Sequence, residues 1–315
     1  MKKLTDILNI DYPIIMAPMF LVSTPKMIIE ALKSGITGAI PAMNFRTTEE
    51  LRSAIQQIKA ETSSPFGINL IVNKSNVYLK DQLSICCQEK VAFIITSLGS
   101  PKETIEIAHK NGILVFCDVT DVHYALKVQA LGADAIIAVN NRAGGHAGPH
   151  SLETLLPELI STCSIPIISA GGIGNNTELK QVLNYDIAGV SIGSIFIAST
   201  EAEVSEEYKN ACVQYSDKDI VLSTKLSGTP CTIIKTPYVE KIGVHQNWFE
   251  RFLNSNKRLK KWLKMFTFYK GMNLLKKAAF EATYKTVWCA GPSIKHIHSI
   301  RTIQQIVRDL VSVNS

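Results

Sequence analysis

The sequence contains no apolar run as long as the ~18 residues that a transmembrane helix needs. Its first residues, MKKLTDI, include neither a long apolar stretch nor a small-residue cleavage site, so they do not resemble a secretory signal. The cysteines are seven in number and none forms a CxxC pair, which is typical of reduced thiols rather than of a disulfide framework. We therefore expect a cytoplasmic protein without a transmembrane segment.

Charged residues are sparse at 19%, whereas hydrophobic residues make up 46% of the chain. This balance excludes intrinsic disorder and predicts a large core. At roughly 150 residues per domain, the length predicts about two domains, or one large α/β barrel with an insertion.

Eight short runs rich in Ile, Val and Ala alternate with segments that have the length and pattern of helices. The runs are almost continuously apolar, as parallel strands buried on both faces should be. Eight strand–helix units within about 200 residues predict an α/β fold of the (β/α)₈ TIM-barrel class. The predicted strands are 13–17, 36–40, 66–72, 91–96, 113–118, 135–139, 165–170 and 187–192.

An open doubly wound sheet is the alternative for the same pattern. The count of eight favours the barrel, as does the lack of a GxGxxG string after the first predicted strand. The strand–helix alternation ends near Thr200. We predict that 1–200 and 286–315 form the barrel, and that 201–285 form an inserted, mainly helical lid. An amphipathic helix at 300–311 would close the barrel.

The reactive surface of such a barrel is the rim at the carboxyl ends of its strands. Gly171 and Gly172 follow the seventh predicted strand, and Gly193 and Ser194 follow the eighth. Glycines at strand ends let backbone N–H groups approach an anion, so this pair of loops predicts a cup for a phosphate monoester. Tight turns without a ligand are the alternative.

Two side chains near other strand ends could take part in chemistry. His146 lies in the string GGHAG after the sixth predicted strand, where small neighbours leave its ring room to enter a cavity. Histidine titrates near neutral pH, so it could act as a base or hold a substrate anion, although a structural or merely exposed histidine is the alternative. Asp118 ends the fifth predicted strand and either faces the barrel mouth or caps the next helix.

Six strings occur in order along the chain: PIIMAPM, FGINLIV, ITSLGSP, AGGHAG, SAGGIG and GVSIGSIFIAST. Together they resemble the flavin-dependent nitronate monooxygenase family, and flavin-type enoyl-acyl-carrier-protein reductases share the same framework. The resemblance covers residues 10 to about 235. It implies an FMN cofactor across the barrel mouth, with its phosphate at the tips of the seventh and eighth strands.

The resemblance also implies roles for individual residues. Gly171, Gly172, Gly193 and Ser194 would hold the phosphate, and His146 would be the catalytic or substrate-orienting residue. The other candidate cofactor-binding residues are Ala17, Pro18 and Met19 along the isoalloxazine, Asn69 with Thr96 or Ser97 at its polar edge, and Ala143, Gly144 and Ser169. Arg142 departs from the family pattern, since many relatives carry an acidic residue there, and so does the loop at 290–296.

The implied reaction is the oxidation of an alkyl nitronate by O₂ to a carbonyl compound and nitrite. Two alternatives stay open. One is an NAD(P)H-dependent flavin reductase acting on an enoyl thioester, and the other is a flavin-free lyase or isomerase that uses the phosphate cup for its substrate. No Lys lies at a predicted strand tip of the barrel, which argues against a Schiff-base enzyme.

Nine Lys and Arg residues and no Asp or Glu lie within 251–277. A solvated lid helix, a docking site for an anionic acyl carrier or CoA, and a membrane-surface helix are the three interpretations of this segment. We expect no nucleic-acid partner, because no binding motif accompanies the charge. We also expect no metal site, since His296 and His298 would need ligands from elsewhere. A homodimer is one assembly state that we consider.

Overall fold

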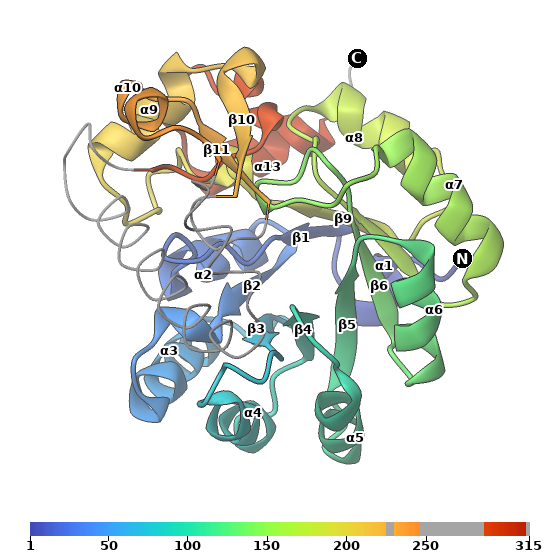
Figure 1. Cartoon of the computed structure of the whole chain (residues 1–315). Coiled ribbons are helices and arrows are strands. Elements are labelled where there is room, and N and C mark those ends of the chain that lie inside the picture. Colours follow the sequence, from blue (N-terminus) through green and yellow to red (C-terminus); the bar gives the residue numbers. More distant parts are fainter. Residues whose placement is uncertain (225–229, 246–286, 313–315) are drawn as a thin grey trace, which may run out of the picture.

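The structure is a computed structural model that describes residues 1–224, 230–245 and 287–312. Eight parallel strands close into a barrel, in which β9 pairs with β1 (Figure 1). This closure confirms the predicted TIM-barrel class. The barrel strands are β1 (Ile14–Met16), β2 (Thr37–Pro41), β3 (Gly67–Ile71), β4 (Phe93–Ser97), β5 (Leu114–Val119), β6 (Ala135–Val139), β8 (Ile167–Ala170) and β9 (Gly189–Ile192).

Helices surround the barrel because each has one apolar face to bury against the strands. Several begin at a side-chain cap: Thr24, Thr47 and Asp121, for example, accept hydrogen bonds from backbone N–H groups of the first turn. The helices that follow the first seven barrel strands are α2 (Pro25–Lys33), α3 (Thr48–Glu61), α4 (Leu79–Gln88), α5 (Lys102–Lys110), α6 (Val122–Ala130), α7 (Leu152–Thr162) and α8 (Asn176–Leu183).

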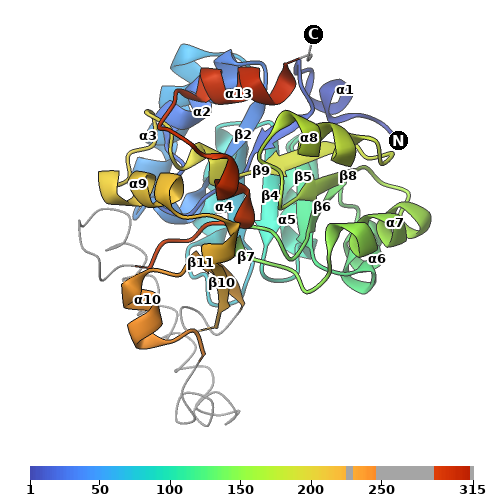
Figure 2. The same ribbon diagram turned by 90° about the horizontal axis from the view of Figure 1, so that it is seen from above.

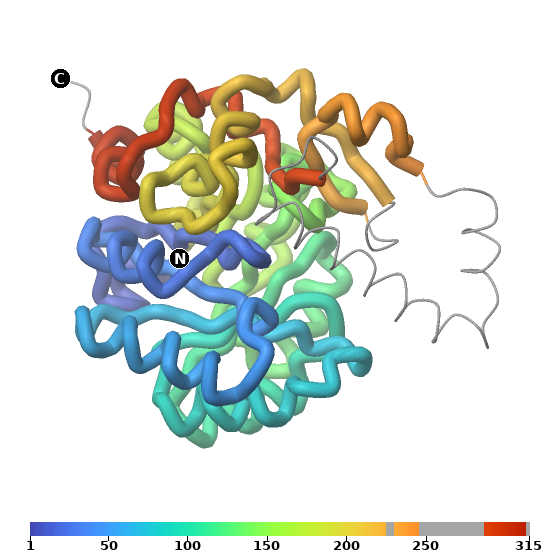
Figure 3. The backbone as a smooth tube through the Cα atoms, turned by 90° about the vertical axis from the view of Figure 1, so that its left-hand side faces the viewer, coloured from blue at the N-terminus to red at the C-terminus, as the bar shows by residue number. Residues whose placement is uncertain are grey.

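The place of the eighth barrel helix is taken by α13 (Ile303–Val311), which packs against both α2 and α8. Figure 2 and Figure 3 show this helix, in red, beside the blue α2. Its buried residues, Ile303, Ile306, Val307 and Leu310, recur at helical spacing, as an amphipathic helix requires. The chain therefore leaves the barrel after β9 and returns to it about a hundred residues later.

Side chains fill the barrel at the amino-terminal ends of its strands, opposite the rim. Phe93 and Phe116 stack with ring centroids 4.9 Å apart, and α1 (Leu4–Leu8) contributes two buried leucines to the same cluster. Gly67 is required beneath them, since an added Cβ would lie 2.2 Å from the Phe93 ring. Because this end is filled, a ligand can enter the barrel only at the carboxyl ends of the strands.

A second, smaller sheet lies beside the rim. Its strands are β10 (Ile220–Ser223), β11 (Cys231–Ile234) and β7 (Gly145–His146), in the order β10-β11-β7. Both pairings are antiparallel, so the loop after β6 is joined to the inserted segment (Figure 2). The remaining elements of the described residues are α9 (Glu206–Gln214), α10 (Pro237–Ile242) and the 3₁₀ turns η1 (Ala42–Asn44), η2 (Ser194–Phe196), η3 (Asp217–Asp219) and η4 (Pro292–His296).

The described part of 201–285 is thus not purely helical, because β10 and β11 occur between α9 and α10. Each strand has only four residues and is held by its neighbours rather than by a long apolar pattern, which is why the sequence did not predict it. The domain limits remain a prediction, and the basic segment 251–277 lies outside the described residues. Within the described ranges, no helix is long and apolar enough to cross a membrane.

Candidate active site

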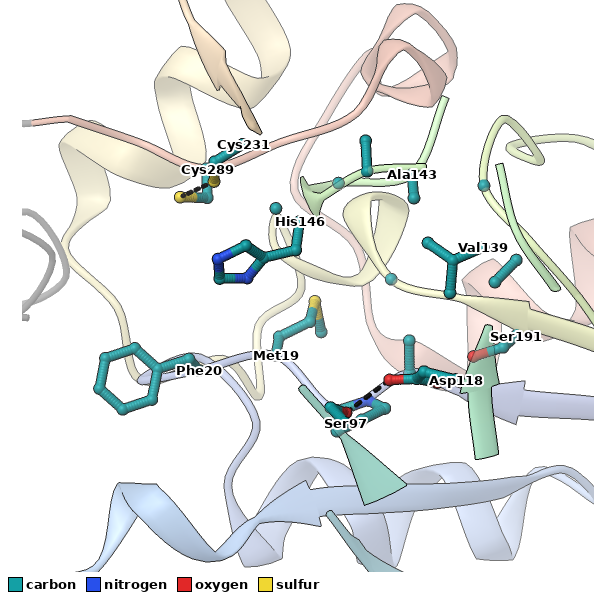
Figure 4. A pocket seen from close by; sticks show the side chains of 18 of the residues that line it. Met19, Phe20, Ser97, Asp118, Val139, Ala143, His146, Ser191, Cys231 and Cys289 are labelled. Carbon is teal, nitrogen blue, oxygen red and sulfur yellow. Dashed lines mark hydrogen bonds between the residues drawn. The ribbon is translucent and has the colours of Figure 1, made fainter. Parts of the chain in front are cut away.

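A cavity of about 810 Å³ opens where the barrel rim meets the small sheet (Figure 4). Its size falls within the ~300–1,000 Å³ that is usual for sites of small molecules and cofactors. The structure brings most of the predicted site residues to this one cavity, although they come from six different strand ends. Those that line it are Ala17, Pro18, Met19, Asn69, Ser97, Ala143, Gly144, His146, Gly171, Gly172, Gly193 and Ser194.

Thr96 and Ser169 are not among the residues that line the cavity; of the alternatives Thr96 or Ser97, it is Ser97 that lines it, and the cofactor contact of Ser169 stays a prediction. Side chains alternate across a strand, and the neighbouring Ser97 and Ala170 occupy the cavity face. Thr96 instead donates its hydroxyl to Cys117 Sγ at 3.2 Å. Ser169 Oγ is buried and has no hydrogen-bond partner among the described residues.

The two glycines after β8 are needed for packing as well as for any ligand. Gly171 and Gly172 have φ angles of +113° and +81°, which favour glycine. A Cβ on Gly171 would lie 2.4 Å from Asn140 Oδ1, and one on Gly172 would lie 2.8 Å from Arg142 Cδ. The loop after β6 therefore rests directly on these glycines. Asn140 fixes it there by donating from Nδ2 to Gly171 O at 3.0 Å.

The loops after β8 and β9 contain backbone N–H groups that are available as hydrogen-bond donors. Among the described residues, the N–H groups of Gly172, Ile173 and Gly193 donate no hydrogen bond, and all three residues line the cavity. Ser194 Oγ accepts from Gly291 N at 2.8 Å, so its own hydrogen is left to donate. Unused donors on adjacent loops form the kind of concavity that binds a phosphate, and they fit the phosphate end of a flavin mononucleotide.

The tips of β3, β4 and β5 carry a chain of polar side chains. Asn69 Nδ2 donates to Ile95 O at 3.1 Å and to Ser97 Oγ at 2.8 Å, and Ser97 Oγ donates to Asp118 Oδ2 at 2.5 Å. Both Asn69 hydrogens are thereby used, which leaves its Oδ1 to accept from a ligand N–H. Asp118 lines the cavity, so the structure places it at the barrel mouth rather than in a helix cap.

Burial raises the pKa of Asp118 to about 6, although the hydrogen bond from Ser97 opposes this shift. The residue is half-buried because one side of it faces the cavity. A carboxyl group with a raised pKa in a cleft is a common feature of functional sites.

His146 enters the cavity from the small sheet. Its backbone pairs with Cys231 of β11, and Figure 4 shows its ring directed into the cavity. The loop that carries it is fixed by Thr232, whose Oγ1 donates to Ala143 O at 2.6 Å. Desolvation by the surrounding protein lowers the pKa of His146 below 6.5. The uncharged form of the imidazole is therefore favoured at neutral pH.

The wall around His146 contains residues that sequence reasoning missed. Cys231 and Cys289 lie with their Sγ atoms 3.7 Å apart, and Phe20 and Tyr208 also line the cavity. The hydrogen bond with Cys289 and burial both raise the pKa of the Cys231 thiol. No local signal marks these residues, since pairing of distant segments brings them together. Among the described residues, no group of three or more His, Cys, Asp or Glu side chains is arranged to hold a metal ion.

Comparison with known proteins identifies the family. The family model for nitronate monooxygenase matches residues 1–81 and 76–312. Together with the barrel and its cavity, this match defines a flavin-dependent oxidoreductase. The chain belongs to the nitronate monooxygenase family.

The similar proteins include enzymes with different names. A (3aS,4S,5R,7aS)-5-hydroxy-7a-methyl-1-oxo-octahydro-1H-indene-4-carboxyl-CoA dehydrogenase from Rhodococcus jostii is 28% identical over 76% of this chain and 67% of its own length. A probable nitronate monooxygenase from Staphylococcus aureus is 27% identical over 78% of this chain and 81% of its own length. The structure of FabK from Thermotoga maritima is 26% identical, with a TM-score of 0.83, and the match covers 98% of this chain and 94% of FabK.

Proposed function

We propose that this protein is an FMN-dependent nitronate monooxygenase, which oxidises alkyl nitronates with O₂ to carbonyl compounds and nitrite. The observation that carries the proposal is the imidazole of His146, directed into a cavity whose opposite rim offers unused backbone donors for a phosphate. The match of the nitronate monooxygenase model to nearly the whole chain supports it.

In this proposal the cavity residues hold FMN by its two ends. The N–H groups of Gly172, Ile173 and Gly193 and the hydroxyl of Ser194 would hold the phosphate. Ala17, Pro18 and Met19 would contact the ring system, and Asn69 and Ser97 would bond its polar edge; all of these residues line the cavity. The bound flavin supplies the capacity to take electrons from the substrate and to pass them to O₂.

In this proposal His146 accepts a proton from the substrate or stabilises its negative charge. When the substrate arrives as a neutral nitroalkane, the uncharged imidazole accepts the proton from its α-carbon. The resulting imidazolium then lies beside the nitronate anion and stabilises it. When the substrate arrives already ionised, the ring N–H donates to a nitro oxygen. Met19 and Phe20 add apolar surface to the same cavity.

Turnover by the purified protein tests this function. After reconstitution with FMN, we expect propyl-2-nitronate to drive O₂ consumption and nitrite release. His146→Ala should retain FMN and lose turnover, because the binding residues lie on the opposite rim. His150→Ala is the matched control, since His150 lies in the same loop and does not line the cavity. A fully active His146→Ala enzyme would remove this residue from the mechanism.

A second candidate is an NAD(P)H-dependent reductase of enoyl thioesters, because FabK matches 98% of this chain with a TM-score of 0.83. Anaerobic mixing separates the two functions. Prompt bleaching of the flavin by NADH or NADPH favours the reductase, whereas bleaching only by a nitronate favours the monooxygenase. A colourless protein that does not take up FMN would point to the flavin-free lyase or isomerase.

A further inference from the structure

The hydrogen-bonded chain of Asn69, Ser97 and Asp118 ends in a carboxyl group that the proposed function does not use. Its three members come from the tips of the adjacent strands β3, β4 and β5, and all three line the cavity; Figure 4 shows the bond between Ser97 and Asp118. Asn69 donates to Ser97 at 2.8 Å and Ser97 donates to Asp118 at 2.5 Å, so both hydrogen bonds are directed toward the carboxylate. The chain therefore holds the carboxyl group in one position at the cavity floor.

The charge of this carboxylate is not balanced nearby. In the described ranges, no ion pair includes Asp118. The titratable groups that interact with it are Cys117 of its own strand and Tyr124 of α6. Neither of them carries a positive charge, and β6 meets it with Ile137. The cationic or basic side chains of the cavity, Arg142 and His146, come from the loop after β6 and do not contribute to its pKa shift.

We propose that Asp118 faces the bound flavin and that its charge lowers the flavin reduction potential, with Ser97 and Asn69 as the residues that position it. The inference rests on the proposed function only in requiring that a flavin occupies the cavity. Reduction adds negative charge to a flavin. A fixed carboxylate opposes this addition more strongly beside protein atoms than it would in water, because protein screens charge less than water does.

A pH dependence follows with a definite sign. Burial raises the pKa of Asp118 to about 6, and an oxidised flavin, which is uncharged at its ring, adds no charge that would shift this pKa strongly. Reduction raises this pKa further, because the added negative charge disfavours the carboxylate. Across the interval between the two pKa values, reduction is accompanied by uptake of a proton on Asp118. The potential should therefore fall more steeply with pH in that interval than on either side of it.

The test is the flavin reduction potential of the holoenzyme between pH 5 and pH 8, measured by equilibration with a reference dye. Asp118→Asn should raise the potential at pH 8, have little effect at pH 5 and remove the steep interval. Ser97→Ala should move the steep interval to higher pH, since the lost hydrogen bond raises the pKa of the carboxyl group. Asp121→Asn is the matched control, because Asp121 caps α6 and does not line the cavity.

An Asp118→Asn holoenzyme with the wild-type potential at every pH would overturn the inference. If that variant fails to fold or to hold flavin, Ser97→Ala provides the test. A Ser97→Ala holoenzyme whose potential falls steeply over the same pH interval as the wild type would also overturn the inference. The measurement needs bound flavin but no turnover, so an enzyme inactive on nitronates still gives a result. A wild-type protein that binds no flavin would reject both proposals, whereas unchanged potentials in an active nitronate oxidase would reject only this one.

Discussion

The barrel rim and the small sheet build facing walls of the same cavity, but they hold their residues by different means. Rim residues such as Asn69 and Ser97 end strands that are paired on both sides within a closed barrel. His146 lies on β7, a strand of two residues that pairs with β11, and Thr232 donates a hydrogen bond to the loop before it. In the proposed function, the barrel strands would therefore frame the cofactor, whereas the residue that acts on the substrate would lie on a short sheet.

The largest expected effect comes from breaking the rim. Gly171→Ala should sharply reduce both flavin content and thermal stability, because its Cβ would meet Asn140 Oδ1 at 2.4 Å in addition to the strain of a positive φ. Overpacking of this kind costs about 1–3 kcal/mol. Gly112→Ala is the control, since its φ is also positive but nothing lies within 4 Å of the added Cβ. Equal melting temperatures for the two variants would contradict the close packing of the 140–143 loop.

The next effect concerns the side chain on the small sheet. General-base catalysis contributes about 10²–10⁴-fold, so His146→Gln should lower kcat/KM for neutral nitroethane by that order. Because desolvation lowers the pKa of His146, wild-type kcat/KM should rise with pH and reach half its plateau below pH 6.5. Initial rates from pH 5 to pH 8 measure this, with the preformed nitronate as a comparison. A kcat/KM that reached half its plateau only above pH 7 would contradict a base whose pKa is lowered by desolvation.

A smaller effect is expected from loosening the connection between the two walls. Thr232→Val keeps the shape of the side chain but removes the hydrogen bond to Ala143 O. We expect a loss of stability of about 1 kcal/mol and a several-fold fall in kcat with unchanged FMN affinity, since His146 but not the rim is displaced. Thermal melting and an FMN titration give both quantities. Weaker FMN binding with unchanged kcat would show that the small sheet supports the cofactor instead.

The smallest effect tests which side of β4 faces the ligand. Thr96→Val should leave FMN affinity unchanged, because the Thr96 hydroxyl bonds Cys117 on the face away from the cavity. Ser97→Ala should weaken FMN binding several-fold, since Ser97 lines the cavity. Fluorescence titration with FMN compares the two. The reverse order would mean that the strand presents its other face to the flavin.

The sequence predicted the rim residues better than the residues of the small sheet, because the barrel strands have a regular pattern and the small sheet does not. Strand ends such as Ala17 and Gly193 could be located because their strands are apolar runs in a regular alternation with helices. The choice between Thr96 and Ser97 stayed open because an almost continuously apolar strand does not show which of its two faces points inward. The contact between Cys231 and Cys289 had no sequence signal, since these cysteines are separated by 58 positions and meet through antiparallel pairing.

The sequence by itself determined the barrel, its number of strands and the rim loops that carry His146 and the paired glycines. These features follow from local periodicity and from residue types that suit strand ends. Only the tertiary structure decided that Asp118 faces the cavity, that β7 joins a small sheet and that the 140–143 loop packs on Gly171. Those outcomes depend on pairing and close approach between distant segments, which no local pattern of residues specifies.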